Sequence, residues 1–183
     1  MTWAIQEKKL KHSNIPNPNE IKIMAGAIRK PRDRALFILL YLTAGRISEL
    51  VKVLCPKDIT EAEVGPRKVL LIRLKNEKNR KRKFKDIPIP FEREPELIQM
   101  LYEYMDDMDM DVPIFKFGRI RAYQIIKKTT GFNPHFIRHI RLTHLAVYHD
   151  FNDQLLIRFA GWTDSRPAKN YMELKWTDIL QKY

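Results

Sequence analysis

The sequence predicts a mainly α-helical domain that carries one small antiparallel β-sheet. Apolar residues recur at helical spacing along most of the chain, in segments separated by proline, glycine or asparagine. Two short runs, 69–74 and 84–89, are rich in branched and apolar residues and are typical of strands. At 183 residues and 44% hydrophobic, the chain has the length and composition of one domain with a real core. We therefore expect a single α+β domain over 1–183.

The helices are placed by their apolar stripes and by the residues at their ends. Asn19 can cap the first helix, Pro31 suits the first turn of the second, and Gly161 can close the last complete one. We expect helices over about 20–30, 31–43, 47–54, 95–105, 118–128, 134–149 and 152–159, and a final helical segment from 168 to the end. No internal repeat or low-complexity tract is present.

The positive charge is concentrated in one segment. Residues 67–85 hold ten Lys or Arg and one acid, a local +9 within a total of +12. The polar connection 75–83 joins the two expected strands, which predicts a β-hairpin with the charge at its tip. A lysine-rich edge can simply keep a sheet soluble, but the mutual repulsion here favours phosphate binding. The residues expected to contact a nucleic-acid backbone are Lys78, Arg80, Lys81, Arg82, Lys83 and Lys85.

Several function classes are excluded by what the sequence lacks. Cys55 is the single cysteine, so no internal disulfide forms and a reducing cytosol is favoured. The start has no signal-peptide core, and the longest apolar run, 35–42, is far shorter than a membrane span. The acidic cluster 103–111 lacks the glycine and glutamate of a calcium loop, and the histidines have no zinc spacing. No glycine-rich phosphate loop is present, so nucleotide hydrolysis has no support. Taken together, these features lead us to expect a cytoplasmic protein with no membrane partner and no metal site.

Two segments that carry arginine suggest an anion site. Arg46 follows the break at Gly45 and has Glu49 three residues on, although a surface ion pair is the simpler interpretation. His135 and Arg138 lie three residues apart on one face of a helix start, where backbone amides, arginine and histidine together suit an anion. A plain amphipathic helix explains the second segment equally well.

Near the end of the chain, Gly161-Trp162 is followed by Tyr171 nine residues after the tryptophan. Together with the two arginine segments and the basic hairpin, this order resembles the tyrosine recombinases, the phage-integrase family. The family pattern is T-G-x-R-x-S-E-L, a lysine at a β-hairpin, H-x-x-R-H, G-H or G-W, and a tyrosine nine residues later. The matching residues here are 43–50, Lys75, 135–139, Gly161-Trp162 and Tyr171.

The resemblance covers about 18–183, and the chain departs from the family pattern at three points. Ala44 stands where glycine is commoner, and Trp162 stands where most members have histidine. The hairpin is also longer and more basic than usual, which affects the assignment of its lysine. The expected fold is therefore that of the recombinase catalytic domain.

The resemblance implies transesterification of a DNA phosphodiester. Tyr171 would attack the scissile phosphate and form a 3′-phosphotyrosyl enzyme with a free 5′-hydroxyl. Arg46 and Arg138 would clamp the non-bridging oxygens, and His135 would act as base or acid on the tyrosine proton. The covalent bond conserves the phosphodiester energy, so we expect no cofactor and no requirement for ATP or a metal.

The remaining candidates have supporting roles. Lys75 would protonate the leaving 5′-oxygen, with Lys78 in its place if the hairpin register slips. Trp162 would pack on the site and offer its indole N–H to the phosphate. Glu49 would orient an arginine or helix amides unless it forms only a surface ion pair, and His139 would either support the site or sit in the core.

The resemblance also implies double-stranded DNA as the partner, a homotetramer on synapsed DNA and a monomer when free. About twenty residues precede the first matched helix, so we expect the catalytic domain of a longer integrase, or a shortened member without the N-terminal DNA-clamping domain. Segment 1–18 would be a linker, and 172–183 a tail helix that packs on its own core or on the next protomer. The Lys- and Ile-rich, Gly-poor composition suggests a thermophile, and hence an archaeal virus or plasmid integrase.

Two other interpretations of the same residues remain open. A DNA topoisomerase of type IB uses similar side chains, although the small size and the 43–50 block favour a recombinase. A non-catalytic DNA-binding protein could keep a degenerate version of the fold, but decay should have removed some members of the catalytic set.

Overall fold

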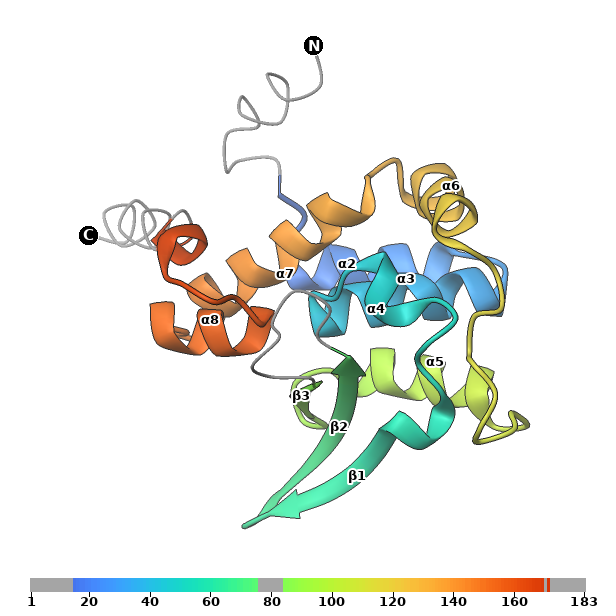
Figure 1. Ribbon diagram of the computed structural model, residues 1–183, viewed down its shortest axis with the longest axis horizontal. Helices are drawn as coiled ribbons and strands as arrows, with labels where there is room; N and C mark the ends of the chain where they lie inside the picture. Colours follow the sequence, from blue (N-terminus) through green and yellow to red (C-terminus); the bar gives the residue numbers. More distant parts are fainter. Residues whose placement is uncertain (1–14, 76–83, 170, 172–183) are drawn as a thin grey trace.

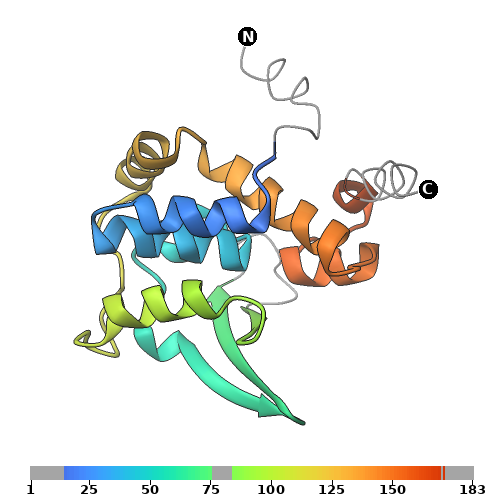
Figure 2. The ribbon, with the colours of Figure 1, turned by 180° about the vertical axis from the view of Figure 1, so that it is seen from behind.

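The structure, a computed structural model, describes residues 15–75, 84–169 and 171. In chain order its elements are α2 (Pro18–Ala27), α3 (Pro31–Thr43), α4 (Ile47–Leu50), the 3-10 turn η2 (Pro56–Asp58), β1 (Ile59–Val64), β2 (Arg67–Lys75), β3 (Phe84–Pro90), α5 (Pro95–Met105), α6 (Arg119–Thr130), α7 (Pro134–Tyr148) and α8 (Asp153–Ala160). Residues 166–169 and 171 are also helical. The predicted fold class, mainly α-helical with one small antiparallel sheet, is confirmed (Figures 1 and 2). The predicted tail 172–183 lies outside the described residues.

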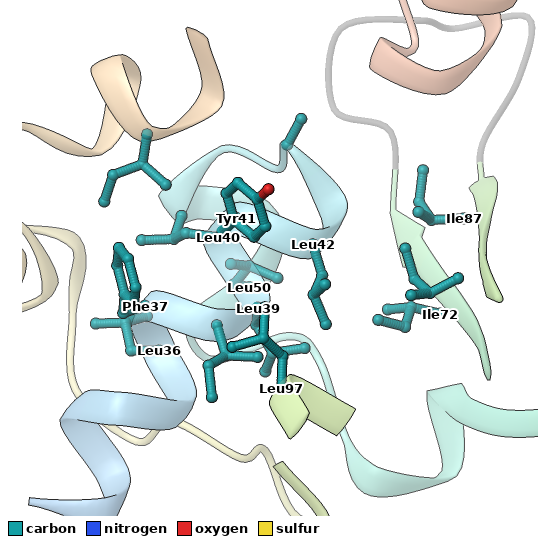
Figure 3. Close-up of a cluster of buried hydrophobic side chains, with 14 of the residues drawn as sticks. Leu36, Phe37, Leu39, Leu40, Tyr41, Leu42, Leu50, Ile72, Ile87 and Leu97 are labelled. Carbon is teal, nitrogen blue, oxygen red and sulfur yellow. The ribbon is translucent and has the colours of Figure 1, made fainter. Parts of the chain in front are cut away.

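Helix α3 forms the centre of the molecule. Every residue from Ala35 to Thr43 is buried, so α3 has apolar side chains on all its sides, as expected of a helix surrounded by other elements. It packs against α7, α5, α6 and α2. Figure 3 shows the result: Leu36, Phe37, Leu39 and Leu40 project in different directions, and Leu42 lies on the side nearest the sheet residues Ile72 and Ile87. Because α3 is fixed by neighbours on all sides, the chain that leaves its C-terminal end is held in a defined position.

The sheet has three antiparallel strands in the order β1-β2-β3. The predicted hairpin is present, with β2 paired to β3 from Val69 opposite Pro90 to Lys75 opposite Phe84. Strand β1 was not predicted. Its residues alternate poorly, since only its first residue is buried, and it pairs with β2 along one edge. In Figure 1 the sheet extends below the helices, and α5 lies between it and α3.

Most predicted helix boundaries agree with the structure, and two do not. Helix α2 begins at Pro18, because Asn17 is the cap, accepting from the Glu20 amide at 3.0 Å, and not Asn19. Helix α4 ends at Leu50 and is followed by a turn with Lys52 at φ +61, so it is much shorter than the predicted 47–54. Gly161 closes α8 with a φ of +71, as predicted.

The turn between α3 and α4 is tightly constrained. Ala44 has a left-handed backbone, with φ +45 and ψ +32, which costs an alanine roughly 1–2 kcal/mol. At Gly45, a Cβ atom would lie 2.7 Å from Thr43 Oγ1 and 3.3 Å from the Leu74 side chain, so a larger residue does not fit without movement. The turn therefore lies directly against the end of β2.

Two further properties concern the described part of the chain. None of its helices is both long and apolar enough to cross a membrane. Within 15–75, 84–169 and 171, no group of three or more His, Cys, Asp or Glu side chains is arranged to hold a metal ion.

Candidate active site

Arg46 and Glu49 form the first part of the site, in the turn that follows α3. The Glu49 carboxylate is fully buried, and its Oε2 accepts the backbone N–H of Arg46 at 2.9 Å. Its Oε1 accepts from Arg46 Nη1 at 3.1 Å, while the Arg46 side chain stays 26% exposed. The pair is therefore not a surface ion pair: a buried carboxylate holds an arginine that still reaches the surface.

Arg138, in the second turn of α7, is buried and joins three segments of the chain. It donates from Nη1 to the carbonyl of Ala44 and from Nη2 to the carbonyl of Ala160 at 3.0 Å. The left-handed backbone of Ala44 accompanies this contact at the end of α3. Burial, and then the nearby charge of Arg46, lower the pKa of Arg138 to about 10, so it remains cationic at neutral pH. The two guanidinium groups that the sequence paired are thus close enough to influence each other.

Tyr171 also lies close to Arg138. It belongs to the helical segment that begins at residue 166, after α8 and the loop 161–165. Its ring stacks on Trp162, with centroids 5.9 Å apart, and Trp162 also lies 5.7 Å from the Arg138 guanidinium carbon. Burial raises the pKa of Tyr171 to about 12, and the charge of Arg138 opposes this rise. The phenol is therefore protonated at neutral pH and needs a proton acceptor before it can act as a nucleophile.

His139 is the histidine that contacts the tyrosine. Its Nδ1 lies 3.2 Å from the Tyr171 hydroxyl oxygen, and the two rings pack 5.2 Å apart. Phe136 stacks on the other side of the imidazole, with centroids 5.9 Å apart. His135, which the sequence favoured for proton transfer, has an exposed side chain in the first turn of α7, one turn before His139. From the sequence, His139 was expected only to support the site or sit in the core, so its contact with the Tyr171 hydroxyl differs from that expectation.

Of the lysines proposed as the general acid, the structure describes Lys75. Lys75 is the last residue of β2 and is exposed, next to Leu74, whose side chain faces the Gly45 turn. This places Lys75 at the end of the sheet that approaches Arg46. Four further DNA-contact candidates and the alternative acid lie outside the described residues; they are Arg80, Lys81, Arg82, Lys83 and Lys78.

Lys85 corrects one expectation. It was expected to contact the DNA backbone, but its side chain is 5% exposed and its Nζ lies 2.9 Å from Glu49 Oε2. The reason is strand alternation: in β3, Lys85 shares the inward face with Ile87 and Ile89. This alternation is visible in the sequence and could have revealed the burial.

The structure thus gathers most of the predicted set at one place. The residues brought together are Arg46, Glu49, Lys85, Arg138, His139, Trp162 and Tyr171. They place a phenol hydroxyl at hydrogen-bond distance from an imidazole nitrogen, close to a buried guanidinium group and an aromatic ring. This combination suits attack on a phosphate ester.

The same fold is found in solved structures of recombinases. The XerH site-specific recombinase bound to a palindromic difH substrate, in a post-cleavage complex, matches with a TM-score of 0.67 and 16% identity over 91% of this chain and 51% of its own. The XerA recombinase matches with a TM-score of 0.67 and 18% identity over 91% of this chain and 64% of its own. The Tn1549 transposon integrase in complex with transposon right end DNA matches with a TM-score of 0.53 and 17% identity, over 90% and 65% of the two chains.

This protein therefore has the fold of the tyrosine-recombinase catalytic domain. It spans between about half and two thirds of the length of the chains that it matches. No protein-family model matches the sequence, and no curated protein matches it significantly. The likeness is one of fold, and the chemistry rests on the residues of the site.

Proposed function

We propose that this protein is a site-specific DNA recombinase or integrase in which Tyr171 is the nucleophile. The observation that carries the proposal is the position of Tyr171. Its hydroxyl lies 3.2 Å from His139 Nδ1, and its ring stacks on Trp162, which packs against Arg138. The Tyr171 hydroxyl thus has an imidazole nitrogen at hydrogen-bond distance and the Arg138 charge nearby, which suits a phenol that attacks a phosphate. The DNA complexes of XerH and the Tn1549 integrase support the choice of DNA as substrate.

In the proposed cleavage step, the Tyr171 oxygen forms a bond to the scissile phosphorus and the bond from phosphorus to the 5′-oxygen breaks. The phenol proton passes to His139, whose Nδ1 must then be the unprotonated ring nitrogen. Arg46 and Arg138 stabilise the charge on the non-bridging oxygens, and Lys75 gives a proton to the 5′-oxygen. His135 remains the second candidate for proton transfer, one turn away on α7.

The rejoining step reverses this chemistry on another strand. A 5′-hydroxyl attacks the phosphotyrosyl bond, the DNA backbone is restored and Tyr171 recovers its proton. One phosphate ester is exchanged for another, so the bond energy is kept and strand exchange can proceed without nucleotide hydrolysis. We propose that synapsis of two DNA duplexes by a tetramer supplies the second strand.

The test is covalent capture on DNA. Because the target sequence is unknown, wild type and Tyr171→Phe are incubated with a library of nicked duplexes of randomised sequence, in which cleavage releases a short fragment and traps the adduct. We expect wild type to form a protein–DNA adduct that resists denaturant, and Tyr171→Phe to form none while binding the library equally well in mobility-shift assays. Sequencing the trapped DNA identifies the target site.

Wild type that binds the library and forms no adduct would return the protein to the non-catalytic DNA-binding class. Adduct formation in Tyr171→Phe would show that another group is the nucleophile. Once the site is known, strand transfer between two copies of it distinguishes a recombinase from a topoisomerase, which would relax supercoiled DNA without exchanging partners.

A further inference from the structure

Lys85 is a buried cation for which DNA contact gives no explanation. Its side chain is 5% exposed on the inner face of β3, where the neighbouring inward residues are isoleucines. A lysine is rarely buried unless it is paired, because loss of hydration of the ammonium group is costly. Burial lowers the pKa of Lys85, and the charges of Arg138 and Arg46 lower it further, whereas Glu49 raises it. The ammonium group is therefore part of the same electrostatic cluster as the two arginines.

Glu49 connects Lys85 to Arg46. Its Oε2 accepts from both Lys85 Nζ and the Arg46 backbone N–H, each at 2.9 Å, and its Oε1 accepts from Arg46 Nη1 at 3.1 Å. The Glu49 carboxylate therefore fixes both the backbone and the guanidinium of Arg46, and Lys85 in turn holds this carboxylate from the buried side. Without Lys85, Glu49 would keep only Arg46 as a partner among the described residues and could draw its guanidinium inward.

The charges in this cluster also bear on the reaction. Arg46, Lys85 and Arg138 carry three positive charges and Glu49 one negative charge, a net +2. A phosphodiester has one negative charge, and attack by a deprotonated phenol brings a second into the transition state. A site with a net +2 thus matches the transition state better than the bound substrate, and this difference is what accelerates a reaction. Removal of Lys85 would reduce the net charge to +1.

We propose that Lys85 is a positioning residue for strand cleavage, which holds Arg46 in place through Glu49. Its positive charge also balances the negative charge of Glu49, so that the charges of both arginines remain available to the phosphate. This inference rests on the proposed function. Lys85 does not contact the DNA, so its removal should affect the chemical step and leave DNA affinity unchanged.

The test compares Lys85→Met with wild type in single-turnover cleavage of the trapped target site. Two substrates are used, one with a normal scissile phosphate and one with a methylphosphonate, which lacks one negative charge. We expect Lys85→Met to slow cleavage of the normal substrate on the order of 100-fold. Cleavage of the methylphosphonate should be slowed by a factor about tenfold smaller, or less. Lys85→Arg, which keeps the charge, should recover part of the rate.

Lys68→Met is the matched control. Lys68 is also paired with a glutamate, Glu61, at 2.7 Å, but its side chain is 50% exposed on the outer part of the sheet. Such an exposed pair contributes little, so the cleavage rate should equal that of wild type. The Kd for DNA and its salt dependence should be the same for Lys85→Met and wild type.

Each other result counts against the proposal. An unchanged rate in Lys85→Met, or an equal loss on both substrates, would show that Lys85 only supports the fold. A flatter salt dependence of binding would show that it contacts DNA after all. If Lys85→Met melts below the assay temperature, Lys85→Gln is used in the same comparison. Wild type that binds DNA but forms no adduct would overturn the proposed function and this inference together. If wild type cleaves and Lys85→Met cleaves equally fast, only the inference about Lys85 fails.

Discussion

At the scale of single residues, the site depends on side chains that act in pairs. Arg138 is held by the carbonyls of Ala44 and Ala160, and Arg46 is held by Glu49, so the protein itself fixes both guanidinium groups. The proposed nucleophile is instead kept protonated: burial raises the pKa of Tyr171 to about 12, and His139 contacts its hydroxyl. In the proposed reaction, removal of the Tyr171 proton is therefore the step that must precede attack on the phosphate.

The leaving-group proton gives a prediction at this scale. Lys75→Ala should slow cleavage by about 100- to 10,000-fold if Lys75 is the general acid, because the 5′-alkoxide leaves poorly without a proton. A substrate with sulfur in place of the bridging 5′-oxygen should restore the rate, since a thiolate leaves without protonation. The measurement is single-turnover cleavage of both substrates, with Lys78→Ala as the matched variant. Restoration of Lys78→Ala and not of Lys75→Ala would assign the acid to Lys78.

At the scale of elements, the hairpin of β2 and β3 separates its charges. Four cations along its strands are paired: Arg67 with Glu92, Lys68 with Glu61, Arg73 with Asp86 and Lys85 with Glu49. The remaining cations of the segment are Lys75 and those in 78–83, against the single acid Glu77. The excess positive charge of the segment thus belongs to Lys75 and to the connection 76–83 between the two strands.

This separation predicts which cations bind DNA. Neutralising Lys81, Arg82 and Lys83 to Gln should weaken binding and flatten the slope of log K against log salt, by roughly 0.9 for each DNA phosphate that the variant no longer neutralises. The matched control changes Arg67, Lys68 and Arg73 to Gln, the same charge change among paired cations, and should alter the slope much less. Equal slopes for the two variants would mean that the tip only keeps the sheet soluble.

At the scale of the whole molecule, helix periodicity and terminal residues were sufficient to predict the fold class and most helices. Helix α3 runs over Pro31–Thr43, as its apolar stripe and Pro31 indicated, and the hairpin strands lie where branched residues cluster. Strand β1 was missed because it is an edge strand with one buried residue and so has little alternation. An exposed edge strand depends on its partner, which local sequence does not describe.

The site was predicted in composition but only partly in geometry. The arginine pair, Trp162 and Tyr171 come together as their order along the chain indicated. His135 and His139 lie on one face of α7, one turn apart, so the choice between them depends on which turn the segment carrying Tyr171 packs against, and the sequence contains no direct signal for that position. Lys85 was misplaced because its charge was weighed and the alternation of β3 was not.

A buried histidine predicts how the stability of the whole molecule depends on pH. His144 Nε2 lies 2.8 Å from the Pro16 carbonyl and must donate to it, so Nδ1 accepts from the Tyr41 hydroxyl at 2.8 Å. Burial lowers the pKa of His144 to about 4. The folded state therefore resists protonation, and the free energy of unfolding should fall by up to about 3 kcal/mol as pH drops from about 6.5 to 4.

The check is denaturant unfolding at several pH values, for wild type and His144→Gln. The variant should lose most of this pH dependence and keep only a smaller part, because burial also lowers the pKa of His149 and contributes in the same direction. The same slope in both proteins would mean that His144 is not the group responsible.

The central claim is that Tyr171 forms a covalent bond to DNA. The most direct measurement is mass spectrometry of the adduct formed on the trapped site, after digestion of the protein with trypsin and of the DNA with nuclease. We predict one modified peptide, in which a nucleotide is joined to Tyr171 through its 3′-phosphate. A modification on any other residue, or an unmodified Tyr171 peptide in wild type that binds the site, would contradict the account.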